Sequence, residues 1–409
     1  MKPKRSFLIV DPILRGSRLF FTHHAAGAFL PYGKVQVLTR SQGLDCHGEA
    51  IFEGSGIEVL NKLLLPDDFW FGLIPERVVE DVANFLENVI EGDSPPSGIY
   101  FTGVKEFFPL LYDVVRRRPS LKSQIPMILV DYDFEHWFSR VVNPLPKSFF
   151  RRVRRRFGLG KKYSNKRKTC MSLLNSFPNA KFGVLDERVF DGDLGLKKKM
   201  SCCLDIPDPG PKELLARVSQ PSLGRPRVRK LRLLLVGIQT RRKGLIDVLR
   251  VVKHPRFPRE SVEFVLYGRL AQDTVNLRAQ LLSLSHSIEW HDGYFEEKVI
   301  QEQYSNADYV VLPYTADYQG SSGVFAFSMA YGKPVLASSH GCIGYRVGKF
   351  GVGLSYKAHD IGSFVNTISC LPDTGSSAYI EMHRFALSYA GKRSVDAHQK
   401  TILKFFGLK

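Results

Sequence analysis

The residues best suited to chemistry form a short run of small polar side chains. A turn of such residues leaves its backbone N–H groups unshielded, and at the start of a helix these groups and the positive end of the helix dipole converge on one spot. The pattern predicts an anion-binding site made of Gln319, Gly320, Ser321, Ser322 and Gly323. The alternative is a tight crossover in which the glycines only let a helix pack on a sheet.

Three consecutive cations, Arg241, Arg242 and Lys243, form a second candidate site. They follow an apolar run that ends at Gly237 and precede Gly244, so they occupy a turn between a predicted strand and a predicted helix. A short basic turn is usually a solvated surface loop. If both turns lie at the same edge of the sheet, however, these cations and Gly237 would contact the anion that binds at the first turn.

A parallel sheet would bring these two turns together. Around the first turn, the residues predict a strand, then a helix that Ser321 or Ser322 caps and Gly332 ends, then another strand. The second half of the chain shows this alternation throughout, with elements expected at residues 231–237, 244–252, 262–268, 273–284, 288–290, 296–305, 307–313, 321–329 and 335–337.

The first half alternates in the same way. Gly16 and Ser17 lie in its first strand–helix turn, where a ligand loop would be expected. Strands and helices are predicted at residues 6–11, 17–30, 35–39, 76–91, 98–102, 107–115, 125–130 and 180–186. Both halves are therefore expected to be doubly wound α/β sheets.

The chain of 409 residues is too long for one ordinary core, and Pro and Gly gather at 205–211 and 221–226 as in an interdomain connection. We expect two Rossmann-like domains and a terminal segment that includes a helix from Val395 to Phe406. Their predicted extents are residues 1–210, 228–390 and 391–409.

Four pieces of the second half resemble the nucleotide-sugar domain of GT-B-fold glycosyltransferases, particularly the retaining group 4 family (glycosyl transferases group 1). They stand in the family's order and lie at residues 236–244, 264–268, 291–313 and 320–338. The resemblance covers roughly residues 230–355, and the first half matches in architecture only. It implies two Rossmann-like domains facing across a cleft, the terminal segment often crossing back onto the first domain.

The resemblance also implies roles for single residues. A lysine before a glycine contacts the donor's diphosphate in the family, and Lys243 matches it. The family's arginine position is Ile238 here, so Arg241 or Arg242 would supply that charge. The family's two glutamates correspond to Gln319 and Phe327, and a phenylalanine accepts no hydrogen bond from a ribose hydroxyl. Fixed cations and a helix N-terminus stabilise a departing diphosphate without a metal.

Acidic residues follow the strand predicted at 125–130. Asp131 and Asp133, with the nearby His136, are candidates for acceptor binding or proton transfer, and we assign the catalytic role to Asp133 and His136. Gly16, Ser17 and Asp131 would lie on the acceptor side. The alternative is that Asp133 only caps a turn.

Residues 147–168 contain eleven lysines and arginines and no acid. On a helix the aromatic and aliphatic side chains would share one face, as in an amphipathic helix on an anionic membrane surface. A solvated charged face and a nucleic-acid arm are the alternatives. The residues expected at the membrane are Phe149, Phe150, Arg151, Arg152, Val153, Arg154, Arg155 and Phe157.

The formal net charge of +18 implies an anionic partner. Six scattered cysteines without metal-ligand spacing argue against a disulfide framework and a structural metal, and favour the cytoplasm or, through residues 147–168, the inner face of the membrane. We therefore expect a metal-independent hexosyltransferase that moves a sugar from a nucleotide-sugar donor, with no other cofactor, to a polysaccharide or lipid-linked acceptor with retention. The alternatives are a non-catalytic GT-B-like binding protein and, less favoured, a nucleic-acid-binding protein.

Overall fold

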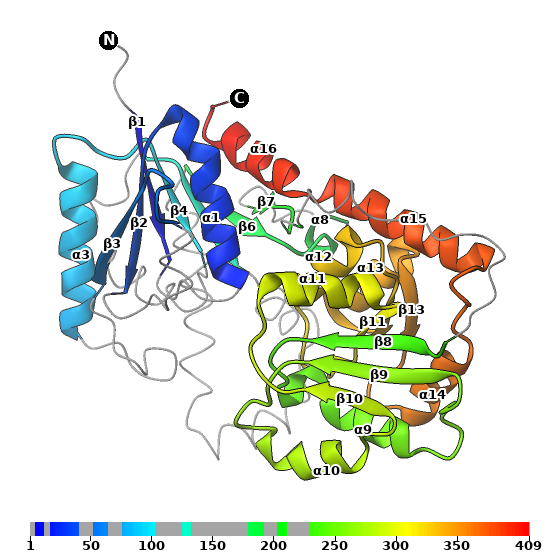
Figure 1. Ribbon diagram of the computed structural model, residues 1–409. Coiled ribbons are helices and arrows are strands. Elements are labelled where there is room, and N and C mark those ends of the chain that lie inside the picture. The colour runs from blue at the N-terminus through cyan, green and yellow to red at the C-terminus, as the bar shows by residue number, and fades with distance from the viewer. Residues whose placement is uncertain are drawn as a thin grey trace, which may run out of the picture. The chain divides into compact units, whose positions relative to one another are not determined.

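The computed structural model describes residues 5–11, 17–40, 52–63, 76–102, 125–131, 179–191, 203–208, 210 and 229–408 (Figure 1). The chain divides into two compact units. Unit 1 comprises Met1–Pro207 together with Ala397–Lys409, and unit 2 comprises Asp208–Asp396. The predicted bounds were residues 1–210 and 228–390 for the two domains and 391–409 for the terminal segment, so unit 2 starts earlier than predicted.

Unit 1 is built on a seven-stranded sheet in the order β3-β2-β1-β4-β5-β6-β7. Every neighbouring pair among these strands is parallel. The chain therefore runs outward from β1 on one side and returns to the other side at β4, which is the doubly wound arrangement. The strands are β1 Arg5–Val10, β2 Gly33–Arg40, β3 Ile57–Leu63, β4 Gly98–Phe101, β5 Met127–Asp131, β6 Ala180–Val184 and β7 Cys203–Asp205.

Helices cover this sheet, and the last residues of the chain pack among them. The ring of Phe7 in β1 stacks on Phe29 at 4.5 Å, and Phe406 meets both rings edge-on. The Gln399 side chain donates to the backbone oxygen of His24. These contacts explain why the terminal residues belong to unit 1. The described helices of this part are α1 Ser17–Phe29, η1 Leu30–Tyr32, α3 Glu76–Glu91, α8 Arg188–Asp191 and α16 Val395–Phe405, whose first two residues lie in unit 2.

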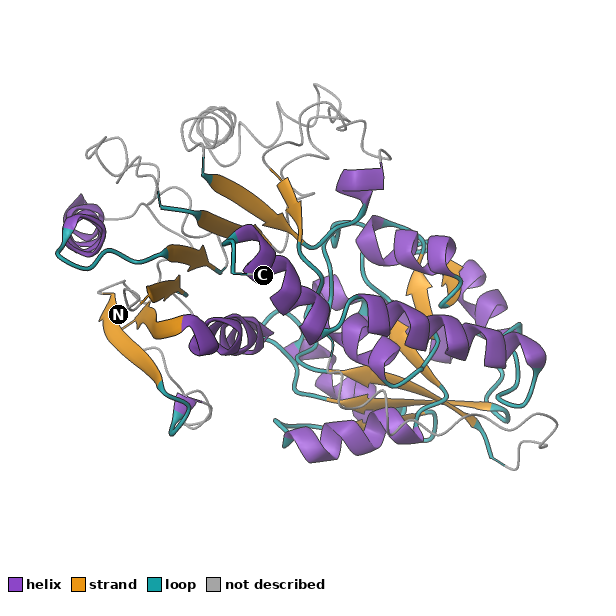
Figure 2. Ribbon diagram, turned by 90° about the horizontal axis from the view of Figure 1, so that it is seen from above, coloured by secondary structure: helices purple, strands orange, loops and turns teal. Residues whose placement is uncertain are grey.

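Unit 2 is built on a six-stranded sheet in the order β10-β9-β8-β11-β12-β13, again with parallel pairs throughout. The strands lie between helices in Figure 2. The strands are β8 Leu231–Val236, β9 Val262–Tyr267, β10 Ile288–His291, β11 Tyr309–Leu312, β12 Val335–Ser338 and β13 Gly353–Tyr356. The helices are η5 Arg241–Lys243, α9 Leu245–Lys253, η6 Val275–Leu277, α10 Arg278–Ser283, α11 Glu297–Asn306, α12 Gly323–Ala330, α13 Gly341–Phe350, α14 Ile361–Ser369 and α15 Ser377–Lys392.

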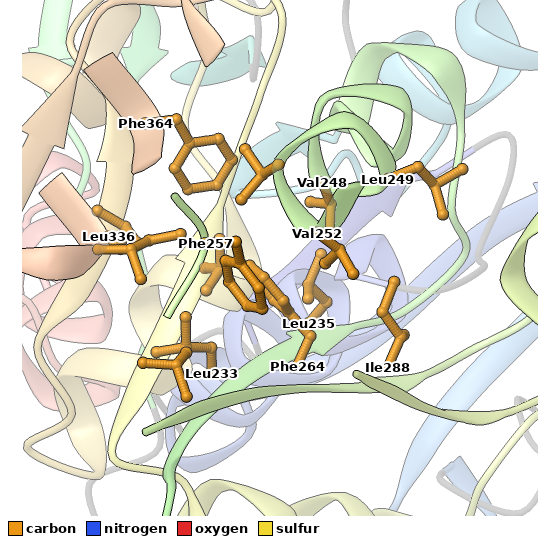
Figure 3. Close-up of a cluster of buried hydrophobic side chains, with 14 of the residues drawn as sticks. Leu233, Leu235, Val248, Leu249, Val252, Phe257, Phe264, Ile288, Leu336 and Phe364 are labelled. Carbon is orange, nitrogen blue, oxygen red and sulfur yellow. The ribbon is translucent and has the colours of Figure 1, made fainter. Parts of the chain in front are cut away.

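Alternate residues of the unit 2 strands enter two separate cores, because side chains of a strand point to opposite faces. Leu233 and Leu235 join the cluster under α9, α10 and α14, and Figure 3 shows them with Val248 and Phe364. Leu234, between them in sequence, joins the cluster under α11, α12, α13 and α15. Both faces of the sheet are thus covered, and the predicted α/β class with two Rossmann-like units is confirmed.

None of the described helices is long and apolar enough to cross a membrane. The segment 147–168 and the predicted helix at 107–115 lie outside the described residues.

Candidate functional site

The two predicted turns meet at one edge of the unit 2 sheet. The neighbouring parallel strands β8 and β11 end at Val236 and Leu312, so the segments that follow them leave the sheet side by side. Thr315, beyond β11, donates from both its backbone nitrogen (3.0 Å) and its hydroxyl (3.1 Å) to the backbone oxygen of Arg242. The basic turn, Arg241–Lys243, is therefore tied to the segment that leads from β11 to the Gly-Ser turn, Gln319–Gly323.

Gly244 makes this approach possible. Its φ of +77° lies in the left-handed region, and a Cβ there would stand 1.6 Å from the backbone oxygen of Pro313. Only glycine allows the backbone to turn into α9 so close to the segment after β11. Lys243, the preceding residue, is thereby held at the sheet edge.

Lys243 is half-buried, and its ammonium lies against the backbone of Gly237. A Cβ added to Gly237 would be 3.2 Å from Nζ. Burial, and secondarily the charge of Arg242, lowers the pKa of Lys243 from 10.5 to about 8. Within the described part of the chain, no carboxylate pairs with this ammonium. A desolvated cation of this kind gains from an anionic ligand.

The two arginines of the turn differ in their surroundings. The Nε of Arg241 donates to the backbone oxygen of Asp273 at 2.8 Å, and its backbone nitrogen donates to the carboxylate of the same residue. The guanidinium of Arg242 lies over the ring of Tyr318, 5.0 Å from its centre. Of the two arginines, Arg242 is therefore the one whose side chain contacts the segment leading to α12.

Ser322 occupies the N-cap position of α12, as predicted, but its hydroxyl makes no capping hydrogen bond. The hydroxyl bonds instead to the buried hydroxyl of Tyr314 at 2.8 Å. Ser321 does not cap the helix either, since its hydroxyl bonds to Asp208 and Arg346. The predicted side-chain cap is wrong, and the first-turn N–H groups of α12 are left for other acceptors.

Gln319 is held within the turn. Its side chain donates to the backbone oxygen of Ala316 at 2.6 Å, and its own backbone oxygen accepts from the nitrogen of Cys342 at 3.0 Å. Gly320 is buried in the same turn, and Gly323 is the first residue of α12.

Phe327, at the family's second glutamate position, packs against the core cluster and stacks on Tyr304 with ring centres 6.0 Å apart. Its side chain therefore contributes to the hydrophobic packing of unit 2.

His359 was not predicted as a site residue. It lies in the loop after β13, with a φ of +63° that is unusual for a residue other than glycine. Its Nδ1 lies 3.1 Å from the buried carboxylate of Asp247 in α9, and its Nε2 lies 3.5 Å from the backbone nitrogen of Ala316. The ring thus links α9 to the segment after β11. No sequence signal marks it, because only the backbone conformation sets it apart.

The predicted catalytic residues, the predicted membrane segment and one of the three acceptor-side residues lie outside the described part of the chain. Gly16, Asp133, His136 and the segment 147–168 lie outside the described residues. Ser17 is the first residue of α1, and Asp131 is the last residue of β5, at the carboxyl edge of the unit 1 sheet.

Residues 230–373 match the sequence profile of the family described as Glycosyl transferases group 1. By sequence, no curated protein matches the chain.

Solved structures match the chain over nearly its whole length. A glycosyltransferase from Rickettsia africae ESF-5 is 11% identical with a TM-score of 0.68, covering 99% of this chain and 98% of that one. Anabaena HepE in complex with UDP-glucose is 16% identical with a TM-score of 0.64, covering 98% and 99%. WaaG, a glycosyltransferase involved in lipopolysaccharide biosynthesis, is 13% identical with a TM-score of 0.59 over the same shares.

At these identities the likeness shows the fold alone, so the chain has the two-unit GT-B fold of these glycosyltransferase structures. The profile match shows that residues 230–373 resemble the family described as Glycosyl transferases group 1.

Proposed function

We propose that the protein transfers a sugar from a nucleotide-sugar donor to a polysaccharide or lipid-linked acceptor, with retention of configuration at the anomeric carbon. The observation that carries the proposal is the half-buried ammonium of Lys243, which has no acidic partner among the described residues and lies beside Gly237. The turn that starts α12 leaves the same sheet edge.

The chemistry follows from where charge develops. When the bond between the sugar and the diphosphate breaks, negative charge grows on the leaving phosphate oxygens. The Lys243 ammonium and the N–H groups at the start of α12 would stabilise that charge, and both are already fixed before the reaction. In this proposal these groups, with Arg242, do the work that a divalent cation does in other enzymes.

The structural neighbours support the donor and acceptor classes. HepE was solved with UDP-glucose, and WaaG acts in lipopolysaccharide biosynthesis. We extend both properties to this chain as parts of the proposal: a nucleoside-diphosphate sugar as donor, and a glycan or lipid-linked glycan as acceptor. Asp133 and His136 remain our candidates for proton transfer, with Gly16, Ser17 and Asp131 on the acceptor side.

The test is donor turnover by the full-length protein with a panel of UDP-, GDP- and ADP-sugars. Release of the nucleoside diphosphate is expected with at least one donor. Lys243→Met should lower kcat/KM by about 10²–10³-fold, the usual effect of removing one charge-stabilising group from an active site.

Lys333→Met is the matched control. Lys333 is also a half-buried lysine of unit 2 with a pKa lowered to about 8, but its Nζ donates to the backbone oxygen of Ser305, away from the two turns. Its loss should leave kcat/KM unchanged. Equal losses in both variants, or turnover with no donor in the panel, would contradict the proposal.

One observation favours a second candidate, a non-catalytic GT-B-like nucleotide-binding protein. Phe327 fills the place of a ribose-binding glutamate with an aromatic ring that packs into the core. Such a protein would show a thermal shift with a nucleoside diphosphate but no turnover of the corresponding sugar donor.

We also propose that residues 147–168 bind an anionic membrane surface, on the sequence evidence of eleven cations, no acid and one apolar face. Sedimentation with vesicles containing phosphatidylglycerol should be strong at low salt and weak at high salt. Replacing the five arginines of 151–156 by glutamine should abolish it. Binding that survives this replacement would rule the segment out.

A further inference from the structure

Arg346 is an unusual residue of unit 2 because its whole side chain is buried, with 0% exposure. It extends from α13, and its guanidinium lies 5.4 Å from the ring centre of Phe325 and 5.7 Å from that of Tyr389. A buried guanidinium is costly unless carboxylates and hydrogen bonds compensate its charge. The contacts of the Arg346 guanidinium therefore indicate which part of unit 2 its charge stabilises.

Two of its partners reach directly to the turn before α12. The Arg346 guanidinium donates to the hydroxyl of Ser321 at 2.7 Å and lies 3.8 Å from the carboxylate of Asp208. The Ser321 hydroxyl in turn donates to that same carboxylate. Since a serine hydroxyl has one hydrogen, Ser321 has none left for a phosphate oxygen.

The backbone of the turn is held as well. The hydroxyl of Tyr318 donates to the backbone oxygen of Ser321 at 2.9 Å. Ser321 is thus fixed by its side chain from one direction and by its carbonyl from another, and its neighbours at 322 and 323 start the helix. What remains available to a ligand is the row of backbone N–H groups that this fixed turn presents.

Asp208 lies outside residues 230–373, the part that matches the family profile. It is the first residue of unit 2, and the segment around it is itself anchored: Gly210 exchanges backbone hydrogen bonds with Arg393 and Val395. Its carboxylate is buried, with 5% exposure. Asp208 therefore brings a fixed charge from a distant part of the sequence to the phosphate-facing turn.

We infer that Asp208 and Arg346 are positioning residues for the diphosphate of the donor: by holding the hydroxyl of Ser321, they keep the N–H groups at the start of α12 in the orientation that binds phosphate. This inference rests on the proposed function. A buried ion pair contributes little net stability compared with apolar residues of the same shape, so the gain from this triad lies in geometry.

The test compares Asp208→Asn, Ser321→Ala and the double variant. Two quantities are measured: hydrogen exchange of the amides of residues 319–325 in the ligand-free protein, and the Kd for UDP, GDP and ADP. Each single variant should speed exchange in this segment about tenfold or more and weaken the tightest nucleotide about tenfold. The double variant should be no weaker than the weaker single variant, because both remove the same interaction.

Two further variants separate positioning from stability. Ser321→Thr keeps a hydroxyl, so it should retain the wild-type exchange rate of residues 319–325 and the wild-type nucleotide affinity. Asp308→Asn breaks another ion pair of unit 2, in which Arg229 donates to Asp308 at 2.7 and 2.9 Å just before β11, away from the turn. It should lower the melting temperature and leave exchange of 319–325 and nucleotide affinity unchanged.

Wild-type protein that binds none of the three nucleotides contradicts the proposed function. Nucleotide binding by the wild type, with exchange or affinity unchanged in Asp208→Asn and Ser321→Ala, contradicts the positioning role alone. A loss of melting temperature in these variants without either change assigns the triad to structure only, and also overturns the inference.

Discussion

Two lysines of unit 2, Lys243 and Lys333, have similarly lowered pKa values but different surroundings. Lys243 and Lys333 both have their pKa lowered to about 8, in each case chiefly by burial. Lys333 uses its ammonium on the backbone oxygen of Ser305, near Asp308, whereas no acid among the described residues faces Lys243. The charge of Lys243 is therefore available to a ligand.

The pKa of Lys243 predicts how nucleotide binding depends on pH. A diphosphate binds the protonated ammonium, so its affinity should fall as pH rises through about 8, by up to about tenfold per pH unit. Calorimetric titration between about pH 6.5 and pH 9.5 measures this. Lys333→Met should keep the profile, and Lys243→Arg should flatten it because arginine stays charged.

In the ligand-free protein, the lowered pKa of Lys243 affects stability, and this effect runs opposite to the effect on nucleotide affinity: stability increases with pH. Between about pH 8 and pH 10.5, where a lysine of the unfolded chain titrates, the folded protein holds fewer protons on Lys243 than the unfolded chain does. This lysine therefore makes stability rise with pH over that window. A nucleotide affinity that is independent of pH would mean that the ammonium does not contact the diphosphate.

Single residues of the site could be predicted only where the signal is local. Lys243 precedes a glycine, and Ser322 stands where a helix begins, so both positions follow from neighbouring residues. The engagement of Ser321 could not be predicted, because its partners lie 113 and 25 residues away in the sequence. Nothing local distinguishes a serine that binds phosphate from one that is held by a buried arginine.

Among the elements, the turn into α9 depends on Gly244. Gly244→Ala would place a methyl group on a left-handed backbone and against the oxygen of Pro313, so we expect a loss of at least about 2 kcal/mol in the free energy of unfolding. Urea denaturation measures it. Because Lys243 would be displaced, nucleotide affinity should fall in the same variant.

Gly348→Ala in α13 is the matched change. Gly348 is exposed in a helix, without a left-handed φ and with no atom within 4 Å of an added Cβ, so alanine should stabilise by about 0.5–1 kcal/mol. If the two substitutions changed the free energy of unfolding equally, the close approach of Gly244 to Pro313 would not be important for the turn into α9.

Element prediction succeeded where periodicity was strong. The apolar spacing of residues 76–91 predicted a helix, and α3 has those bounds. The helix α13 was not predicted, since Gly341, Gly344 and Gly348 all disfavour one. It forms because Ile343 and Val347 pack into the core cluster of unit 2, so tertiary packing overrides propensity there.

For the whole molecule, the alternation of strands and helices was enough to predict two doubly wound units. The order of strands within each sheet was not, because it depends on which crossover returns to which side of β1 or β8. The grouping of the terminal residues with unit 1 has a packing cause, the contact of Phe406 with Phe7 and Phe29. The acceptor side remains a proposal from sequence.

A crystal structure of the protein with the nucleoside diphosphate that binds it most tightly would show directly where the diphosphate lies. We expect phosphate oxygens within hydrogen-bond distance of Lys243 Nζ and of the backbone nitrogens of residues 322–324 at the start of α12. A diphosphate bound elsewhere, or one that leaves both Lys243 and this helix start without contact, would contradict this expectation.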